Sequence, residues 1–159
     1  MRETLSINPI GEKVLQALEK FIERDVLLLE IDANERSLTH RVAIYLQELF
    51  QDMDVDCEYN RDEHDPKELF LPGGDGDTYD TDAQTVYPDI IVHKRKTNDN
   101  LLVIEFKKTS SRIDDSKDFK KLNEYVNQLN YKYALFIEFE VGRIKQGISR
   151  VEWVNANKA

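Results

Sequence analysis

Two short apolar segments of this chain carry charged residues where a buried β-strand would not hold them without a partner. Asp89 precedes the apolar residues 90–92, and Glu105 and Lys107 end a second apolar segment. Side chains two positions apart on a strand point to the same face, so Glu105 and Lys107 share a face and Phe106 points to the other. If the segments pair as a hairpin, two carboxylates and an ammonium group converge. Such a set can bind a metal ion beside a positive charge, which is what phosphodiester hydrolysis requires.

The ligand chemistry of this set favours Mg²⁺ or Mn²⁺. Hard divalent cations prefer oxygen ligands, commonly one or two carboxylates with waters and substrate phosphate. Asp89 and Glu105 would supply the carboxylates, and the backbone carbonyl of Phe106 is a further candidate ligand. Lys107 would orient the attacking water or stabilise charge that develops on the phosphate. The competing interpretation places Glu105 and Lys107 on the solvated face of an edge strand, although residues 101–104 are apolar on both faces, as in a central strand.

Hydrophobic periodicity predicts the elements that would position these residues. Apolar residues at helical spacing predict one helix over about 11–27, and a second that starts after the capping residue Asn34 and ends near 52. A third helix begins at 114 or 115 and reaches about 129. The expected strands cover 54–59, 89–93, 101–107, 133–139 and 149–154.

This order of elements, with Pro88-Asp89 on the second strand and Glu105-Phe106-Lys107 on the third, resembles the PD-(D/E)xK nuclease superfamily. The resemblance spans roughly residues 34–139. It implies an α/β, restriction-endonuclease-like core: a mixed central sheet flanked by helices in the order α-β-β-β-α-β, here with an extra N-terminal helix and a C-terminal strand. Most members of the superfamily cut DNA and some cut RNA, using a divalent metal. Asp89, Glu105 and Lys107 would be the catalytic residues.

The resemblance also implies a third acid. Many members place a glutamate near the metal on the helix before the first core strand, and Glu35 lies at that position. Acids are favoured in the first turn of a helix for dipole reasons alone, so both interpretations of Glu35 stay open. For His40, five residues further on, a solvent-exposed or hydrogen-bonded structural role is favoured over that of a base.

Basic residues near the motif are candidates for contacts with substrate phosphate. Lys108 follows the motif directly, and Lys117 and Lys121 lie on the next expected helix. For the two helical lysines, an ordinary solvated helix face is favoured over a contact with phosphate.

The charge of the chain bears on its partners. The net charge is −9, which disfavours unaided nucleic-acid binding, but residues 62–82 alone hold eight acids and one base and leave −2 for the rest. We interpret residues 61–84 as an exposed or disordered insertion within a single domain spanning 1–159. The run from Asp75 does not match a calcium-binding EF-hand loop, because position six is Asp80 and position twelve is Val86.

Composition also bounds the cellular setting. No apolar run approaches a membrane span, and residues 1–4 lead into no signal-peptide core. The single Cys57 cannot form an internal disulfide and is most simply a small buried apolar residue. We therefore expect a cytoplasmic protein that has no membrane partner.

Taken together, the sequence predicts a metal-dependent nuclease, with DNA favoured over RNA as substrate. The alternative is a non-catalytic or partner-dependent binding subunit of the same fold, for example in a defence or mobile-element system. No DNA-recognition module is evident, so a homodimer or a partner protein would supply recognition.

Overall fold

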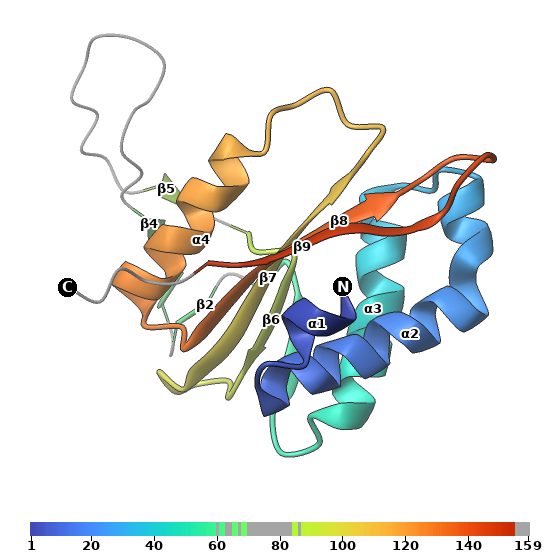
Figure 1. Cartoon of the computed structure of the whole chain (residues 1–159). Coiled ribbons are helices and arrows are strands. Elements are labelled where there is room, and N and C mark those ends of the chain that lie inside the picture. Colours follow the sequence, from blue (N-terminus) through green and yellow to red (C-terminus); the bar gives the residue numbers. More distant parts are fainter. Residues whose placement is uncertain (60, 63–64, 67, 70–83, 86, 155–159) are drawn as a thin grey trace, which may run out of the picture.

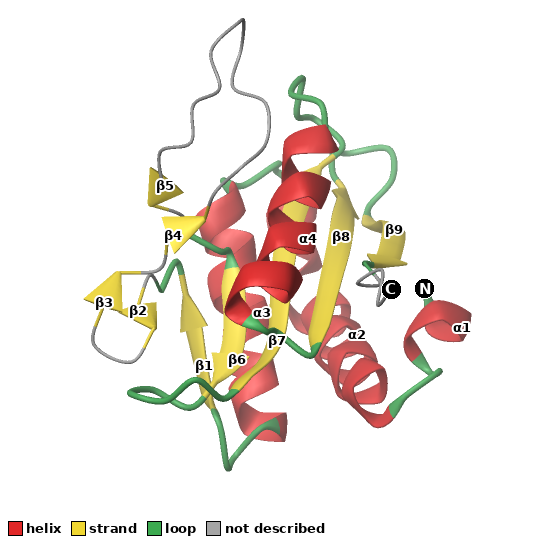
Figure 2. Ribbon diagram, turned by 90° about the vertical axis from the view of Figure 1, so that its left-hand side faces the viewer, coloured by secondary structure: helices red, strands yellow, loops and turns green. Residues whose placement is uncertain are grey.

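The computed structural model describes residues 1–59, 61–62, 65–66, 68–69, 84–85 and 87–154. A five-stranded sheet in the order β1-β6-β7-β8-β9 has helices on both faces (Figures 1 and 2). The strands are β1 (Asp54–Cys57), β6 (Ile90–His93), β7 (Asn100–Lys108), β8 (Tyr133–Glu140) and β9 (Gly147–Trp153). The helices are α1 (Arg2–Leu5), α2 (Pro9–Glu30), α3 (Glu35–Leu49) and α4 (Ser116–Leu129).

The sheet is mixed, because only β7 and β8 run parallel, and α4 forms the crossover between them. β1, β6 and β7 are antiparallel neighbours, as are β8 and β9. The α/β class with a mixed sheet flanked by helices, predicted from the sequence, is thereby confirmed. The β6–β7 hairpin expected from the two apolar segments also forms, with Ile90 opposite Ile104.

Alternation along β7 divides the core into two layers. Leu102, Ile104 and Phe106 pack against α2 and α3, whereas Val103 packs with Tyr125 of α4 on the other face. Figure 2 shows α4 in front of the sheet and α2 and α3 behind it. Both faces are covered, which explains why the central strands are apolar on both sides.

The helix boundaries follow from their capping residues. The Asn34 side chain accepts a hydrogen bond from the Ser37 amide, as its expected role as the cap of α3 requires. Asn8 caps α2 in the same way, so α2 starts before the predicted residue 11, and it also extends beyond the predicted residue 27 to Glu30. The short α1 was not predicted. It packs so closely on α2 that a Cβ atom at Gly11 would stand 2.0 Å from the Leu5 carbonyl oxygen.

The acidic insertion lies largely outside the described residues. Its described parts are four two-residue strands, which pair as β2 (Arg61–Asp62) with β3 (Asp65–Pro66) and β4 (Glu68–Leu69) with β5 (Gln84–Thr85). These short strands were not predicted. No helix in the described part of the chain is long and apolar enough to cross a membrane.

The expectation that Cys57 is buried is wrong. Its side chain is exposed, because β1 is an edge strand and Cys57 is its last residue. The residue is exposed, but its sulfur atom lies 3.9 Å from the Thr39 carbonyl of α3, and this local burial, followed by the charges of Asp56 and Asp89, raises the pKa of the thiol to about 11. A thiol with this pKa is almost entirely protonated at neutral pH and is a poor nucleophile.

Asp56, the residue before Cys57 on β1, contacts two basic side chains. Its Oδ2 lies 2.8 Å from His93 Nε2, and Arg95 donates to both of its oxygens. Burial raises the pKa of Asp56, but the hydrogen bonds from His93 and Arg95 outweigh that effect and bring it down to about 2. The carboxylate thus anchors the β6–β7 turn to the edge strand.

Replacing Asp56 with asparagine should destabilise the protein at pH 7 by about 1–2 kcal/mol, after allowance for solvent screening. A lowered carboxyl pKa stabilises the fold above its unfolded value near 3.8, and this stabilisation is lost as the pH falls toward 2. Urea unfolding should therefore show a large difference between wild type and Asp56→Asn at pH 7 and a small one near pH 2. The exposed Asp52 is a matched control, and an equal loss in Asp52→Asn would contradict the role of Asp56.

Candidate active site

Glu105 lies in the middle of the sheet and not at its edge. β7 is the third of five strands, and Glu105 is only 1% exposed. The solvated-edge interpretation is therefore wrong for Glu105. A buried carboxylate is costly unless it is paired, hydrogen-bonded or bound to a metal, so its position calls for a partner.

Asp89 reaches the same place from the neighbouring strand. It lies one residue beyond the Ile90–Ile104 pair, and its Oδ2 accepts a hydrogen bond of 2.7 Å from the Phe106 amide. The N–H and C=O of one strand residue point to the same side, so the Phe106 carbonyl is also directed toward this strand end. Burial raises the pKa of Asp89, and the bond from Phe106 acts in the opposite direction.

Lys121 of α4 is the cation that meets Glu105. Its Nζ donates to Glu105 Oε2 at 3.0 Å and lies 3.9 Å from Asp118 Oδ1. Burial, and then the nearby charge of Asp89, raise the pKa of Glu105 well above its ordinary value despite this contact. Burial acts to lower the pKa of Lys121, but the charge and the hydrogen bond of Glu105 outweigh it, together with the charges of Asp89 and Asp118, and keep this pKa above its ordinary value. The two groups therefore form a partly buried ion pair.

One oxygen of this ion pair has no partner. Within the described residues, Glu105 Oε1 is fully buried and makes no hydrogen bond, and the same is true of the hydroxyl of Tyr125, one turn beyond Lys121 on α4. Burial, and then the charge of Glu105, raise the pKa of Tyr125, so the hydroxyl stays protonated. Asp89 and the Tyr125 hydroxyl also interact with the Glu105 carboxyl group, so Oε1 lacks only a hydrogen bond of good geometry, which a further donor or a cation can replace.

Lys107 shares the strand face of Glu105 but points to a different acid. Its Nζ pairs with Asp118 Oδ2 and lies 3.4 Å from the Asp114 carbonyl. Asp118 therefore stands between the two lysines, with one oxygen toward Lys107 and the other toward Lys121. The ammonium expected beside the motif carboxylates is present, yet Lys121 is the one that contacts Glu105.

Glu35 approaches the group from the first turn of α3. Burial, followed by the negative charges of Asp89 and Asp118, raises its pKa to about 7, and Lys107 acts in the opposite direction. These mutual electrostatic effects place Glu35 in the field of the candidate site. Its position is the one that the family resemblance implies for a third acid.

The cluster as a whole contains more negative than positive charge. Its members are Glu35, Asp89, Glu105, Lys107, Asp118 and Lys121. The raised pKa values of three of the acids show that a further positive charge at this place would be favourable.

The residues present fit a magnesium or manganese ion. Glu105 Oε1 is a buried oxygen without a hydrogen bond, and Asp89, the residue before β6, lies close enough for its charge to act on Glu105. No three acidic, histidine or cysteine side chains in the described ranges are arranged as a complete metal cage. Mg²⁺ does not need one, because it is usually held by one or two carboxylates and completes its shell with waters and phosphate.

Asp118 of the cluster and Tyr125, which interacts with Glu105, were not singled out as site residues from the sequence. With Lys121 they occupy positions i, i+3 and i+7 of α4, which is the spacing of one helix face. The spacing of these three residues could be recognised in the sequence, but the sequence did not show that this face of the helix lies against Glu105.

The remaining predicted residues make no hydrogen bond or ion pair with Asp89 or Glu105 in the described part of the chain, although the charge of Lys108 acts to lower the pKa of Glu35. Lys108 is on the opposite strand face, where Nζ bonds to Asp32 and to the Ala33 carbonyl. Lys117 is exposed, as is His40. The exposed His40 agrees with the structural role favoured for it.

Comparisons with protein-family models, with curated proteins and with solved structures find no match to this chain. What the site can do is therefore inferred from its own residues.

Proposed function

We propose that this protein is a divalent-metal-dependent nuclease with a restriction-endonuclease-like fold that hydrolyses phosphodiester bonds, preferably in DNA. The observation that carries the proposal is the buried Glu105 with an unused oxygen, beside Asp89 at the end of a central hairpin and 3.0 Å from the ammonium of Lys121. Buried, mutually perturbed carboxylates next to a lysine are typical of catalytic sites and costly for a purely structural one.

Asp89, Glu105 and the Phe106 carbonyl would hold Mg²⁺ or Mn²⁺, and Glu35 would join them directly or through water. When bound, such an ion polarises phosphate and lowers the pKa of a coordinated water. The hydrogen bond from the Phe106 amide fixes the orientation of the Asp89 carboxylate. Glu35, with a pKa of about 7, can exchange a proton near neutral pH.

Two ammonium groups are available to stabilise negative charge on the reacting phosphate. Lys107 is the one expected from the motif, and Lys121 is the one in contact with Glu105. Asp118 contacts both lysines and so holds their ammonium groups in place.

A second function of the same fold is a nucleic-acid-binding subunit that cuts only with a partner, or not at all. The observation that favours it is that Lys107 and Lys121 are both engaged with acids of the chain, in a protein of net charge −9. In that case a second copy or a partner protein would complete recognition or the site.

Incubation with plasmid, linear duplex and single-stranded DNA in Mn²⁺ tests the nuclease directly. Wild type should cut at least one of these substrates, and Asp89→Asn should reduce the rate by about 10²–10³-fold, because a metal ligand is lost while side-chain shape is kept.

Asp99→Asn is a matched control, since Asp99 lies at the far β6–β7 turn and pairs with Lys132. Full activity of Asp89→Asn would contradict the assignment. Absence of both cleavage and Mn²⁺ binding in wild type, measured by calorimetry, would favour the binding subunit.

A further inference from the structure

Two isoleucines stand exposed on loops at the same end of the sheet. Ile144 is fully exposed at the tip of the β8–β9 hairpin, and Ile113, 69% exposed, lies on the loop that follows β7. β7 and β8 are adjacent parallel strands, so both loops leave the sheet at one end. Figure 1 shows this end opposite the β6–β7 turn. Neither side chain contributes to the core.

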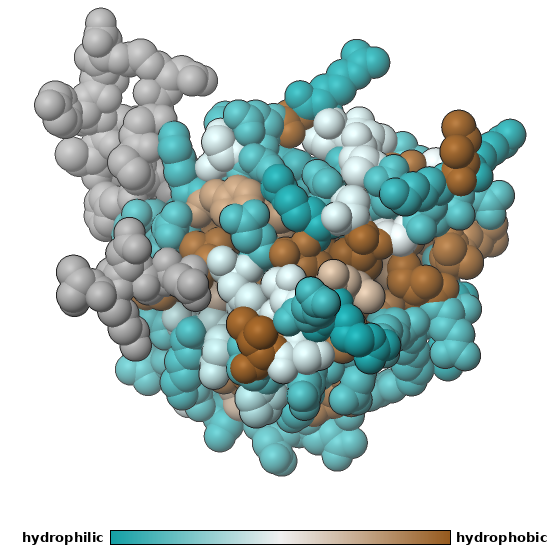
Figure 3. All heavy atoms as spheres, viewed as in Figure 1, coloured by the Kyte–Doolittle hydropathy of each residue, from teal (hydrophilic) through white to brown (hydrophobic). Residues whose placement is uncertain are grey.

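The β8–β9 tip is held in place. The Gly142 amide donates to the Leu29 carbonyl of α2 at 2.9 Å, and the Val141 amide donates to the Thr109 hydroxyl at 3.1 Å. Gly142 and Gly147, both with positive φ, bracket residues 143–146. In the space-filling view a hydrophobic side chain projects at this tip among hydrophilic ones (Figure 3). A fixed backbone thus presents an apolar side chain to solvent.

Basic residues flank Ile144 on both sides, and one base precedes Ile113, which Asp114 follows. Arg112 precedes Ile113, and Arg143 and Lys145 enclose Ile144. All three bases are exposed, and none forms an ion pair or hydrogen bond within the part of the chain that the structure describes. Most other arginines and lysines of the described fold are paired with acids.

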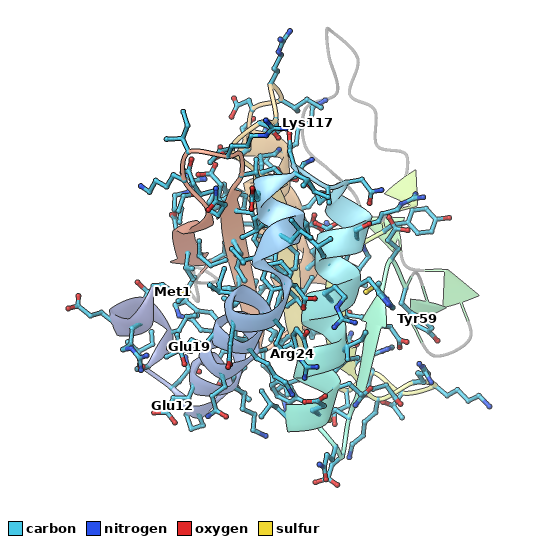
Figure 4. All side chains as sticks on the ribbon, turned by 90° about the vertical axis from the view of Figure 1, so that its right-hand side faces the viewer. Met1, Glu12, Glu19, Arg24, Tyr59 and Lys117 are labelled. Atoms are coloured by element: carbon cyan, nitrogen blue, oxygen red, sulfur yellow. The ribbon has the colours of Figure 1, made fainter. Side chains whose placement is uncertain are left out.

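The acids near these loops are mostly occupied. Asp114 caps the Ser116 amide, Asp115 pairs with Arg150, and Asp32 binds Lys108 and Ser110. The Asp114 carboxylate bonds no basic side chain in the described part of the chain, so its negative charge, like those of Glu30 and Glu140, is not paired with a base. Lys117, at the start of α4, adds another exposed cation, and Figure 4 shows it at the opposite end of the molecule from Glu12. Although the chain is acidic, this end offers cations that are free to bind an anionic partner.

We propose that residues 112–113 and 143–145, together called the two-loop ridge, bind duplex nucleic acid. Arg112, Arg143 and Lys145 contact backbone phosphates, and Ile113 and Ile144, which lie on separate loops, each insert at a base-pair step of their own. Apolar wedges flanked by basic residues are a known means of unstacking and bending a duplex. The choice of nucleic acid as the partner rests on the proposed function. The ridge lies beyond the ends of β7 and β8, and Glu105 and Lys107 lie in the second half of β7, toward the same end of the sheet.

Salt dependence tests the charges of the ridge. Binding to a short duplex in EDTA, where nothing is cut, is measured over a range of salt concentrations. The double variant Arg143→Ala with Lys145→Ala should make the negative slope of log K against log salt shallower by about two, because two phosphate contacts are lost. Lys94→Ala with Lys96→Ala makes the same change of net charge with exposed residues of the far β6–β7 turn. An equal reduction in both double variants would overturn the proposal, since net charge alone would then account for it.

A fluorescent adenine analogue in the duplex, which brightens on unstacking, tests the wedges. Wild type should raise the fluorescence, and Ile144→Ser and Ile113→Ser should each lose most of that rise. Ile7→Ser is the matched control, because Ile7 is 68% exposed before α2, away from the ridge. An unchanged rise in Ile144→Ser and Ile113→Ser, or no rise in wild type, would overturn the proposal.

Two further outcomes would assign the ridge to another partner and overturn the proposal. These are binding to anionic vesicles without duplex binding, and dimerisation that Ile144→Ser abolishes. Failure of the proposed function is distinguishable. Duplex binding with unstacking but without cleavage or Mn²⁺ uptake would support the ridge alone, whereas cleavage with unaltered binding by the ridge variants would refute the ridge alone.

Discussion

Replacing Glu105 with glutamine should reduce metal-dependent cleavage by about 10²–10³-fold or more and remove the thermal stabilisation that Mn²⁺ gives the wild type. Glu105 Oε1 is the unused buried oxygen of the site, and an amide there is a much weaker ligand for a hard cation. A ligand that binds only the folded state raises its stability, by about 2.7 kcal/mol at a hundred times the dissociation constant. Melting curves with and without Mn²⁺ measure this gain, which should be absent in Glu105→Gln.

The same substitution should have a different effect on the metal-free protein. Burial, and then the charge of Asp89, raise the pKa of Glu105 well above its ordinary value. A raised carboxyl pKa means that ionisation costs folding free energy, and this cost appears above the unfolded pKa near 4.5 and grows as the pH rises toward the folded value. Without metal, the melting temperature of Glu105→Gln relative to wild type should therefore increase between pH 5 and pH 8.

A carboxylate at the same end of the sheet controls for charge. Glu140 ends β8, and Glu140→Gln makes the same chemical change outside the cluster. It should leave cleavage and the Mn²⁺ response at the wild-type level. If Glu105→Gln still cut at the wild-type rate, or were still stabilised by Mn²⁺, the assignment of Glu105 as a metal ligand would be wrong.

The central part of the site was predictable because it depends on local rules. Alternation along a strand placed Glu105 and Lys107 on one face, and pairing of two apolar segments brought Asp89 beside them. The capping residue Asn34 fixed the start of α3 and with it the position of Glu35. Each inference required only neighbours in sequence or a single hairpin.

The contacts made by α4 were not predictable in the same way. Lys121 and Asp118 appeared in the sequence as parts of an amphipathic helix, and only the packing of α4 on β7 turns them toward Glu105 and Lys107. A parallel crossover sets that orientation through the whole β7–α4–β8 unit. The exposure of Cys57 was not predictable either, because it depends on strand order. Alternation with acids is compatible with a buried residue in a central strand and with an exposed one in an edge strand such as β1.

The two lysines of the site should differ in their contribution to cleavage. Lys121→Met should slow cleavage by about 10²–10³-fold, and Lys107→Met should slow it less. The Lys121 ammonium is already 3.0 Å from Glu105, the expected metal ligand. Lys107 is turned toward Asp118 and the Asp114 carbonyl, from which it would have to be released before it could meet the substrate.

Metal binding distinguishes this role from a purely structural one. Lys121 Nζ shares Glu105 with the expected ion, so removing its charge should strengthen Mn²⁺ binding while cleavage falls. Methionine keeps the length and much of the volume of the side chain, and calorimetry with single-turnover cleavage separates the two effects. Lys120→Met, on an exposed part of α4, is the control. If Lys107→Met abolished cleavage and Lys121→Met did not, the motif lysine would be the group that stabilises the reacting phosphate, and the Lys121–Glu105 pair would serve only to neutralise a buried charge.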